Sequence, residues 1–291
     1  MRAADLRTGK SHGDENFPVA SLLLAPEHRK AILAFYHFAR VADDVADHPS
    51  LTPDEKLALL DWLEAGLDGA SSGDEEAVAL RTTLAERGLP DCHARALLQA
   101  FRQDATVKRY HSWLELMDYC AYSAMPVGRF VLDVHGEPRA ARTASDAICA
   151  ARQIINHLQD CAQDYRQLDR VYLPLDMLRR QGACVEELGQ ARASQGLRKC
   201  IQHLADRADR LLDTGESFAA HVRNPRLARE IAVIIALARS NAARLRVEDP
   251  LQGGGRTNKP QALFITLATL LRSLTRHTPT LQRRTLDDAG A

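Results

Sequence analysis

Two groups of polar side chains in this 291-residue chain have the spacing of a helix face. In "ARVADDVADH", residues 39–48, Asp43 and Asp47 are four positions apart and Arg40 precedes them. Side chains four apart lie on one face of an α-helix, so the two carboxylates repel each other unless a cation lies beside them. Asp44 points about 100° away from Asp43 and is assigned no role. Taken alone, such a pair most often belongs to a solvated helix surface.

A second polar stripe changes that interpretation. Within "ARQIINHLQDCAQDYRQLDRVYLP" it consists of Gln153, Asn156, Asp160 and Asp164. At about 100° per residue, these side chains occupy an arc of about 80° on one helix face, while the neighbouring isoleucines point elsewhere. Amide and carboxylate oxygens on an otherwise buried helix need polar partners or an ion.

The oxygen donors of the two faces suit magnesium, which binds through one or two carboxylates together with substrate phosphates. We therefore predict that Mg²⁺, or Mn²⁺ in its place, holds a diphosphate between two helices. The two facing aspartate pairs, Asp43 with Asp47 and Asp160 with Asp164, are the basis of this prediction. A di-iron or di-manganese bundle is the competing interpretation, but its Glu-x-x-His element does not occur in the chain.

The elements that must position these residues are helices. Apolar residues recur at steps of three and four, as in "LALLDWLEAGL" and "LRKCIQHLADRADRLLDTG", and sustained alternation is absent. Thr52-Pro53 and Asn224-Pro225 predict helix starts, whereas Gly88 and Gly136 predict helix ends. We expect an all-α protein of roughly eight to ten helices.

No composition shift divides the chain, so we expect one domain over residues 1–291, with a core from about 12 to 275 and a frayed polar tail at 276–291. The glycine-rich "PLQGGGRTNKP" at 250–260 lacks the spacing of a phosphate-binding loop. That segment predicts a flexible loop.

Composition excludes several classes of partner. The 38 basic and 38 acidic side chains cancel, which argues against a nucleic-acid partner and favours a local binding site. Six cysteines without paired short spacing indicate reduced core residues in a cytoplasmic protein. The longest aliphatic run, "IAVIIALA", is too short to span a bilayer, which leaves peripheral contact with the inner face of the membrane open.

The segment from 104 to 137 lies between the two acidic helices. Its Lys108 and Arg109 are candidates for phosphate contacts, although a basic pair is more often a solvated helix end. Pro126 and Gly128 interrupt a helical pattern, which predicts a kink or a close approach to the backbone. The aromatic residues are by default core residues and would also suit a cavity that stabilises a carbocation.

These segments resemble a known family. "FYHFARVADDVAD", "YCAYSAMPVGRFVL" and the stripe segment resemble, in order and spacing, the three signature segments of the squalene and phytoene synthase family. That family has the all-α isoprenoid synthase fold and joins prenyl diphosphates head to head. Within it, "GDENFPVASLLLAPEHR" is similar to the hydroxysqualene synthase branch of bacterial hopanoid biosynthesis, called HpnC.

The resemblance implies an activity. Enzymes of this branch ionise presqualene diphosphate with Mg²⁺, rearrange the carbocation and quench it with water, giving hydroxysqualene and diphosphate without NADPH. It implies coupling to a presqualene diphosphate synthase before this step and a hydroxysqualene oxidoreductase after it. The alternatives are a transferase that condenses two prenyl diphosphates to presqualene diphosphate, squalene or phytoene, and a non-catalytic assembly factor, which would not need both aspartate sets.

The resemblance also implies residue roles. It implies five metal ligands, because Asp43 and Asp47 match the first metal-binding motif of the family and Asn156, Asp160 and Asp164 match the second. Tyr122 matches a catalytic tyrosine near the reacting carbons. The implied substrate-binding residues are Phe17, Arg40, Lys108, Arg109, Tyr119, Gln153, Tyr172 and Lys259. The chain departs from the family pattern at Ala121, Met125 and Gln159, where Arg, Asn and Arg are expected.

Overall fold

The computed structural model describes residues 26–70 and 73–275. Within these ranges the chain forms twelve α-helices, and it has no strand beyond one isolated bridge between Arg109 and Val171, so the prediction of an all-α protein is confirmed. The helices are α1 (Pro26–Asp47), α2 (Pro53–Asp68), α3 (Glu75–Arg87), α4 (Cys92–Thr106), α5 (Trp113–Ser123), α6 (Met125–Val134), α7 (Arg142–Gln163), α8 (Leu175–Arg180), α9 (Gln195–Gly215), α10 (Phe218–His221), α11 (Pro225–Val247) and α12 (Lys259–Thr275). Periodicity undercounts them because α8 and α10, with six and four residues, are too short to repeat a pattern.

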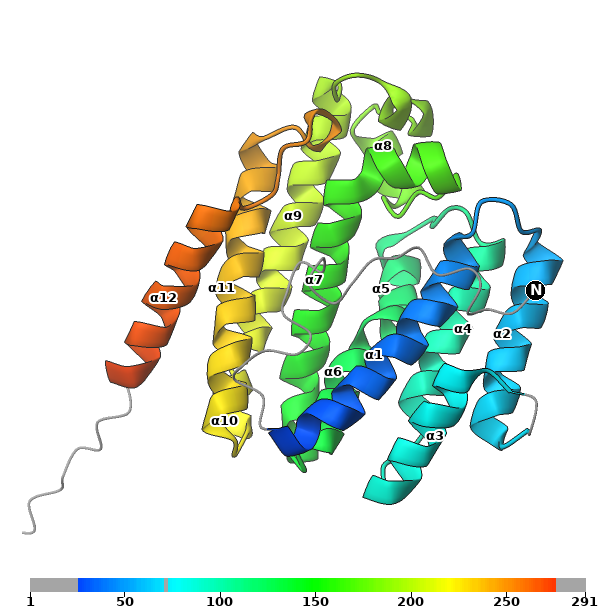
Figure 1. Ribbon diagram of the computed structural model, residues 1–291. Coiled ribbons are helices and arrows are strands. Elements are labelled where there is room, and N and C mark those ends of the chain that lie inside the picture. The colour runs from blue at the N-terminus through cyan, green and yellow to red at the C-terminus, as the bar shows by residue number, and fades with distance from the viewer. Residues whose placement is uncertain (1–25, 71–72, 276–291) are drawn as a thin grey trace, which may run out of the picture.

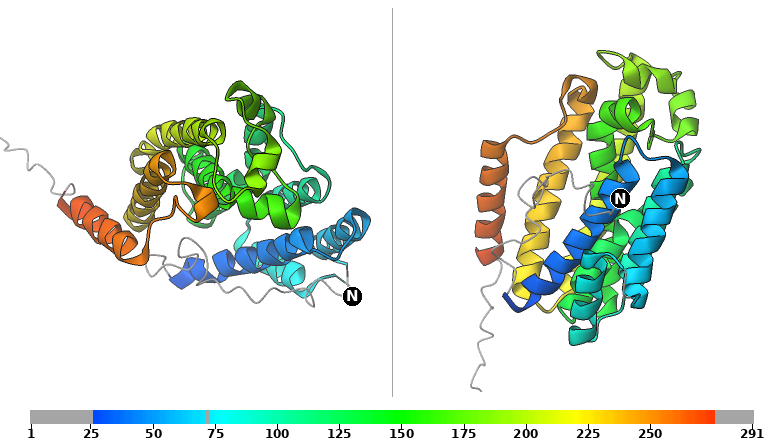
Figure 2. Two further views of the ribbon diagram at one scale, coloured as in Figure 1. Left: turned by 90° about the horizontal axis from the view of Figure 1, so that it is seen from above. Right: turned by 45° about the vertical axis from the view of Figure 1, so that its right-hand side comes forward.

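Helix α7 lies in the middle of the molecule, between two groups of helices (Figure 1). On one side α7 packs along α9, and α11 contacts both of them. On the other side α1 packs against α3, α4 and α6, and α6 in turn contacts α7. Helix α12 packs on α11 at the outer edge (Figure 2). The two predicted acidic segments are thereby placed on separate helices, α1 and α7.

The helix ends follow the predicted signals. Thr52 and Glu55 form a capping box at the start of α2, in which the Thr52 N–H donates to the Glu55 carboxylate at 2.8 Å. Asn224 caps α11 with its side-chain oxygen. Gly88 ends α3 in the left-handed conformation, with φ of 61°, which glycine adopts without the strain of a side chain.

Apolar packing fixes which face of α1 and α7 turns inward. The clusters around α1 and α7 are separate: the first joins α1–α4 and α6, where the Phe35 and Phe130 rings stack at 4.0 Å, and the second joins α5, α7, α8, α9 and α11. Ile154, Ile155 and Leu158 anchor α7 in the second cluster, each 1% exposed. Each such side chain contributes about 1.5–3 kcal/mol on burial. The polar stripe on the same helix is therefore held away from the core.

The break between α5 and α6 is confirmed, and it brings α6 close to α7. Ala124 leaves helical geometry with φ of −122°, and Pro126 occupies the first turn of α6. A Cβ at Gly128 would lie 2.3 Å from Ser145 Oγ and 2.7 Å from Cys149 Sγ on α7. Only glycine allows this approach.

The glycine-rich segment is a loop between a 3-10 turn at Pro250–Gln252 and the start of α12, and a hydrogen bond ties it to α7. Its predicted flexibility stays a prediction. The Gly255 N–H donates to Glu248 Oε2 at 2.8 Å, and Gln159 Nε2 on α7 donates to the Gly255 carbonyl at 2.6 Å. Gln159, where the resemblance implied arginine, thus has an anchoring contact.

The prediction of reduced core cysteines is confirmed only in part. All six cysteines are free thiols, but Cys92 and Cys184 are exposed and are therefore not core residues. Among the described residues, none of the helices has the length and apolar character needed to cross a membrane.

Candidate active site

The first acidic face lies at the end of α1, where Arg40 is held by two carboxylates. Its Nη1 donates to Asp43 Oδ2 at 2.6 Å and its Nη2 donates to Asp44 Oδ1 at 2.9 Å. Asp44, assigned no role above, is 7% exposed. Since both acids bind Arg40, the guanidinium is oriented beside the aspartate pair before any ligand arrives.

The second face lies on α7 and continues into the π-helical turn Asp164–Leu168. Gln153, Asn156, Asp160 and Asp164 are all half-buried, whereas the isoleucines between them are buried. They therefore form one stripe, as the spacing indicated. Single π turns often occur at functional sites, because the extra residue changes the direction of the following side chains.

The structure brings the two acidic faces together. Burial and the Asp47 charge raise the pKa of Asp43 to about 8, although Arg40 acts in the opposite direction. Burial and the charges of Asp160 and Asp47 raise the pKa of Asp164 to about 8. Because Asp47 ends α1 and Asp164 follows α7, carboxylates from both faces contribute to one negative field.

Arg170 connects the two faces and was missed in the sequence. It is 4% exposed, and its Nη1 donates to Asp47 Oδ1 at 2.5 Å. Its Nη2 donates to the Ala46 carbonyl at 2.8 Å and its Nε to the Asp104 carbonyl at 3.1 Å. Three donors of one guanidinium thus join the end of α1, the end of α4 and the turn after α7. No spacing signal relates these segments.

A buried network supports Arg170. The hydroxyls of Tyr119 and Tyr172 each donate to the Asp104 carboxylate at 2.9 Å. The His157 ring stacks on Tyr172 with centroids 3.5 Å apart. Burial and the Arg170 charge lower the pKa of His157 to about 3, so the imidazole is neutral. Tyr119 and Tyr172 are 3% and 6% exposed and line neither apolar cavity described below, so their predicted substrate contacts stay a prediction.

Arg256 is a second cation that the sequence did not single out. Its guanidinium pairs with the Asp160 carboxylate from the glycine-rich loop. The loop contacts made by Gln159 and Gly255 set its position. Arginines therefore pair with aspartates of both faces, and their donors are suited to diphosphate oxygens as well.

Two apolar cavities adjoin this polar region. The first, of about 270 Å³, lies between α1, α6 and α11 and includes Arg40 and Asp43 in its wall. The second, of about 250 Å³, lies between α6, α7 and α11 and includes Gln153 and Asn156. Val127, Val131, Ile231 and Ile234 line both cavities. The cavities therefore adjoin each other and join the two polar faces through a hydrocarbon-lined space.

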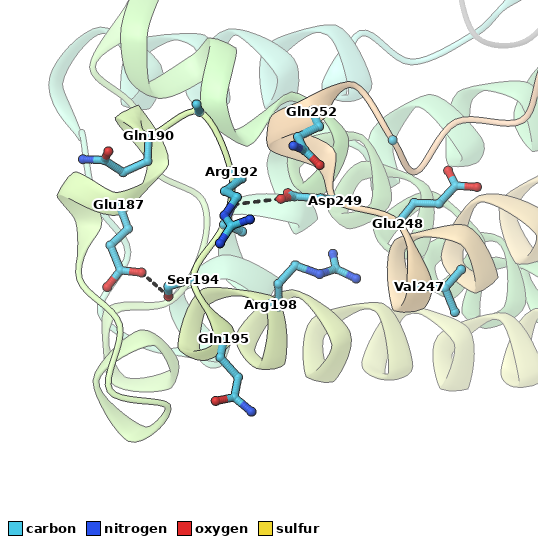
Figure 3. Close-up of a pocket in the computed structure, with 13 residues that line it drawn as sticks. Glu187, Gln190, Arg192, Ser194, Gln195, Arg198, Val247, Glu248, Asp249 and Gln252 are labelled. Atoms are coloured by element: carbon cyan, nitrogen blue, oxygen red, sulfur yellow. Dashed lines mark hydrogen bonds between the residues drawn. The ribbon is translucent and has the colours of Figure 1, made fainter.

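A third hollow, of about 1000 Å³, is more polar and lies between the segment before α9 and the end of α11 (Figure 3). The Ala193 N–H donates to Asp249 Oδ2 across it at 2.8 Å. Its described lining shares no residue with either apolar cavity and contains none of the predicted site residues. Despite its size, it is not part of the candidate active site.

The other predicted site residues that the structure describes lie outside the linings of the two apolar cavities. Lys108 Nζ donates to the Leu168 carbonyl at 3.3 Å, and Arg109 Nη2 donates to the Asp169 carboxylate at 2.6 Å, so both basic residues support the turn that follows Asp164. Tyr122 is 38% exposed and is absent from the described linings of the apolar cavities. Lys259 is exposed at the start of α12, and Phe17 lies outside the described residues. Their predicted contacts stay predictions.

The donor set fits a divalent cation shared with a ligand. The arginine pairs of Asp43, Asp47 and Asp160 each engage one carboxylate oxygen. Within the described residues, no three acidic, histidine or cysteine side chains converge as a closed metal site. An open set of hard oxygen donors on two facing helices is what magnesium bound together with phosphate requires.

Comparisons with known proteins agree with this arrangement. The family model described as squalene/phytoene synthase matches residues 10–260. This chain belongs to the squalene/phytoene synthase family. A hydroxysqualene synthase of Rhodopseudomonas palustris is 55% identical over 249 residues, covering 86% of this chain and 85% of the relative. A hydroxysqualene synthase of Zymomonas mobilis is 47% identical over 265 residues, covering 90% of this chain and 89% of the relative.

Solved structures of the family have the same fold. The squalene synthase HpnC of Alicyclobacillus acidocaldarius superposes with a TM-score of 0.71 at 34% identity, covering 83% of this chain and 90% of that one. A dehydrosqualene synthase in complex with a ligand superposes with a TM-score of 0.75 over 94% of this chain and 95% of that one. At 21% identity, this second likeness concerns the fold alone.

Proposed function

We propose that this family member is a hydroxysqualene synthase, which converts presqualene diphosphate and water into hydroxysqualene and diphosphate. The observation that carries the proposal is the meeting of two acidic helix faces and three arginines beside two adjoining apolar cavities. The 47–55% identity to hydroxysqualene synthases supports the choice of this reaction within the family. We expect functional coupling to a second enzyme that supplies presqualene diphosphate and to a third that reduces hydroxysqualene.

The arginines supply positioned positive charge for the leaving group. Arg40, Arg170 and Arg256 each contact an aspartate of the site, so their orientation does not have to be created when the substrate binds. Positioned charges of this kind stabilise a developing anion at little cost in reorganisation. They favour departure of diphosphate over departure of a neutral group.

Asp43, Asp47, Asn156, Asp160 and Asp164 would hold Mg²⁺, which would neutralise the charge that develops on the diphosphate as its carbon–oxygen bond breaks. The aspartates act as ligands and not as general bases. The cavity walls then receive the carbocation. Phe35 and Phe130 line the first cavity and offer aromatic faces that stabilise positive charge without reacting with it. Because water ends the reaction, no NADPH is consumed.

The proposal is tested with purified protein, Mg²⁺ and presqualene diphosphate in ¹⁸O-labelled water, without NADPH. We expect labelled hydroxysqualene and one diphosphate per product, and no product after chelation of the metal with EDTA. A parallel incubation with farnesyl diphosphate alone should give nothing. Presqualene diphosphate or phytoene-type hydrocarbons from prenyl diphosphates would instead identify a condensing transferase, and an NADPH requirement with squalene as product would identify a one-enzyme squalene synthase.

Peripheral contact with the cytoplasmic face of the membrane is a further part of the proposal. Helix α12 exposes an apolar face formed by Leu263, Phe264, Leu267 and Leu271. At about 100° per residue, these four side chains lie within an arc of about 100°. The substrate and product are polyisoprenoids that partition into lipid, so a lipid surface is the expected occupant of this face. Sedimentation with phospholipid vesicles tests it, because Leu267→Glu should reduce the bound fraction and leave turnover of detergent-solubilised substrate unchanged.

A further inference from the structure

The proposed reaction needs a water molecule held beside the carbocation, and one cavity wall offers a carboxylate for this purpose. Glu230 lies on α11, is 7% exposed and lines the first apolar cavity. In the described linings of the two apolar cavities, the only other acid is Asp43, which belongs to the diphosphate-binding face. Glu230 comes from a different wall of the cavity, formed by α11.

The described residues that line the first cavity together with Glu230 are mostly apolar. Leu227, Ile231 and Ile234 flank it on the α11 wall, and Phe35 and Phe130 line the same cavity from α1 and α6. In a cavity wall of low dielectric, the attraction between a carboxylate and a carbocation is screened less than it is in water.

We infer that Glu230 holds the quenching water and accepts its proton. This inference rests on the proposed function. An oxygen lone pair of the water forms the new bond to the cationic carbon, one O–H bond breaks with its electron pair remaining on oxygen, and the proton passes to a carboxylate oxygen of Glu230. The products are the alcohol and the neutral carboxylic acid, which returns its proton to solvent after product release.

Three polar side chains of the second cavity are less suited to this step. Asn156 and Gln153 orient water through their amides but cannot take up its proton. Arg152 carries positive charge, which repels a carbocation. A carboxylate separated from the cation by one water both attracts the positive charge and acts as a base, while the water prevents direct alkylation of the acid.

The experiment measures, in the complete enzyme, how much hydroxysqualene forms for each diphosphate released. Glu230→Gln, Glu230→Asp and Glu230→Leu are incubated with presqualene diphosphate and Mg²⁺, and both released diphosphate and hydroxysqualene are quantified. Glu216→Gln is the matched control, because that carboxylate pairs with Arg239 on the surface, away from both apolar cavities. Circular dichroism melts accompany each variant. Glu230→Leu retains an apolar cavity wall and is the variant chosen in case Glu230→Gln does not fold.

We expect the hydroxysqualene formed per diphosphate released to fall about tenfold in Glu230→Gln and Glu230→Leu, with hydrocarbon elimination products or unrearranged alcohols in its place. Glu230→Asp should recover part of the ratio. An unchanged ratio in all folded variants overturns the inference. If hydroxysqualene and diphosphate fall in parallel, the ratio is also unchanged, and Glu230 then acts in binding or ionisation. If wild-type protein releases no diphosphate from presqualene diphosphate, the proposed function itself fails and the inference with it.

Discussion

Arg170 donates to the carboxylate of Asp47 at 2.5 Å, which joins the turn after α7 to the last residue of α1. The same guanidinium binds the carbonyls of Ala46 and Asp104. Burial would lower the pKa of Arg170, but Asp104, Tyr172 and Asp47 raise it, so the group is charged throughout the physiological range. The relative position of the two acidic faces thus depends on one buried cation.

Replacing Arg170 by lysine should lower the activity more than it lowers the free energy of unfolding. Arg170→Lys keeps the charge but cannot make three divergent hydrogen bonds. We expect kcat/KM to fall by about 100-fold or more, because a displacement of about 1 Å at a positioned group has effects of that size. Arg180→Lys is the control, since that side chain is 72% exposed where it pairs with Asp176, and it should lose less than about threefold. Equal losses in both variants would contradict the bridging role.

Removing one carboxylate that we propose as a metal ligand should abolish turnover without unfolding the protein. Asp43→Asn and Asp160→Asn each take away a charged oxygen ligand, and we expect kcat to fall by at least about 100-fold, the effect typical of a lost electrostatic contact in a transition state. Far-ultraviolet circular dichroism should be unchanged. Wild-type turnover in either variant would disprove the assignment of these aspartates as metal ligands.

The acidic faces should make the metal-free protein less stable as pH rises. The pKa values of Asp43 and Asp164 are raised to about 8 in the folded state, so between about pH 4 and pH 8 the folded protein binds more protons than the unfolded chain. The free energy of unfolding therefore decreases with pH in this window and levels off above it.

Denaturant titrations at pH 5 and pH 8 measure this slope. Because Asp43 is 36% exposed at its side chain, we expect Asn at this position to stabilise the metal-free protein at pH 8 by only about 1 kcal/mol. Added Mg²⁺ with diphosphate should abolish most of the pH dependence in the wild type. A wild-type slope of the opposite sign would show that the carboxylates do not repel one another in the folded state.

Arg256 should matter for binding the substrate and little for folding. Its side chain is 42% exposed and pairs with Asp160, so Arg256→Gln should change the free energy of unfolding by less than about 1 kcal/mol. We expect KM for the diphosphate substrate to rise about tenfold, corresponding to about 1.4 kcal/mol, because a charge-assisted contact with phosphate is lost. Arg180→Gln, at a 72% exposed side chain, serves as the control. Michaelis–Menten kinetics distinguish the two variants.

The contact between α6 and α7 should tolerate no side chain at position 128. Gly128→Ala places a Cβ within 3 Å of Ser145 and Cys149, so α6 must move and we expect a loss of about 1–3 kcal/mol in stability. Ser145→Ala removes the nearer atom, and the double variant Gly128→Ala/Ser145→Ala should recover part of the loss. Strict additivity of the two changes in urea unfolding would show that the residues do not interact.

Several features of this protein follow from local rules and were predictable. The helix ends at Thr52, Gly88 and Asn224 depend on capping contacts within a few residues. The stripe from Gln153 to Asp164 depends only on helical periodicity. The break at Pro126 follows from the missing backbone donor of proline, and the close approach at Gly128 from its missing side chain.

The long-range partners of the site could not be predicted in the same way. Nothing in the spacing of Arg170, Asp104 and Asp47 indicates that they meet, since 66 and 123 positions separate Arg170 from its partners. Arg256 reaches Asp160 only because Gln159 and Gly255 hold the loop on α7. Conversely, the hydroxyls of Tyr119 and Tyr172 bind Asp104 and do not line an apolar cavity. Helix periodicity cannot predict which of these two surroundings a tyrosine has.

By itself, the sequence determined the helices, the residue types on their polar faces and, through resemblance, the family. The tertiary structure alone decided which of those faces converge, which arginines neutralise them and which carboxylate enters an apolar wall. The physical reason is that periodicity and capping act within one or two helical turns, whereas the site depends on charges and cavities formed between helices by packing of their opposite, apolar faces.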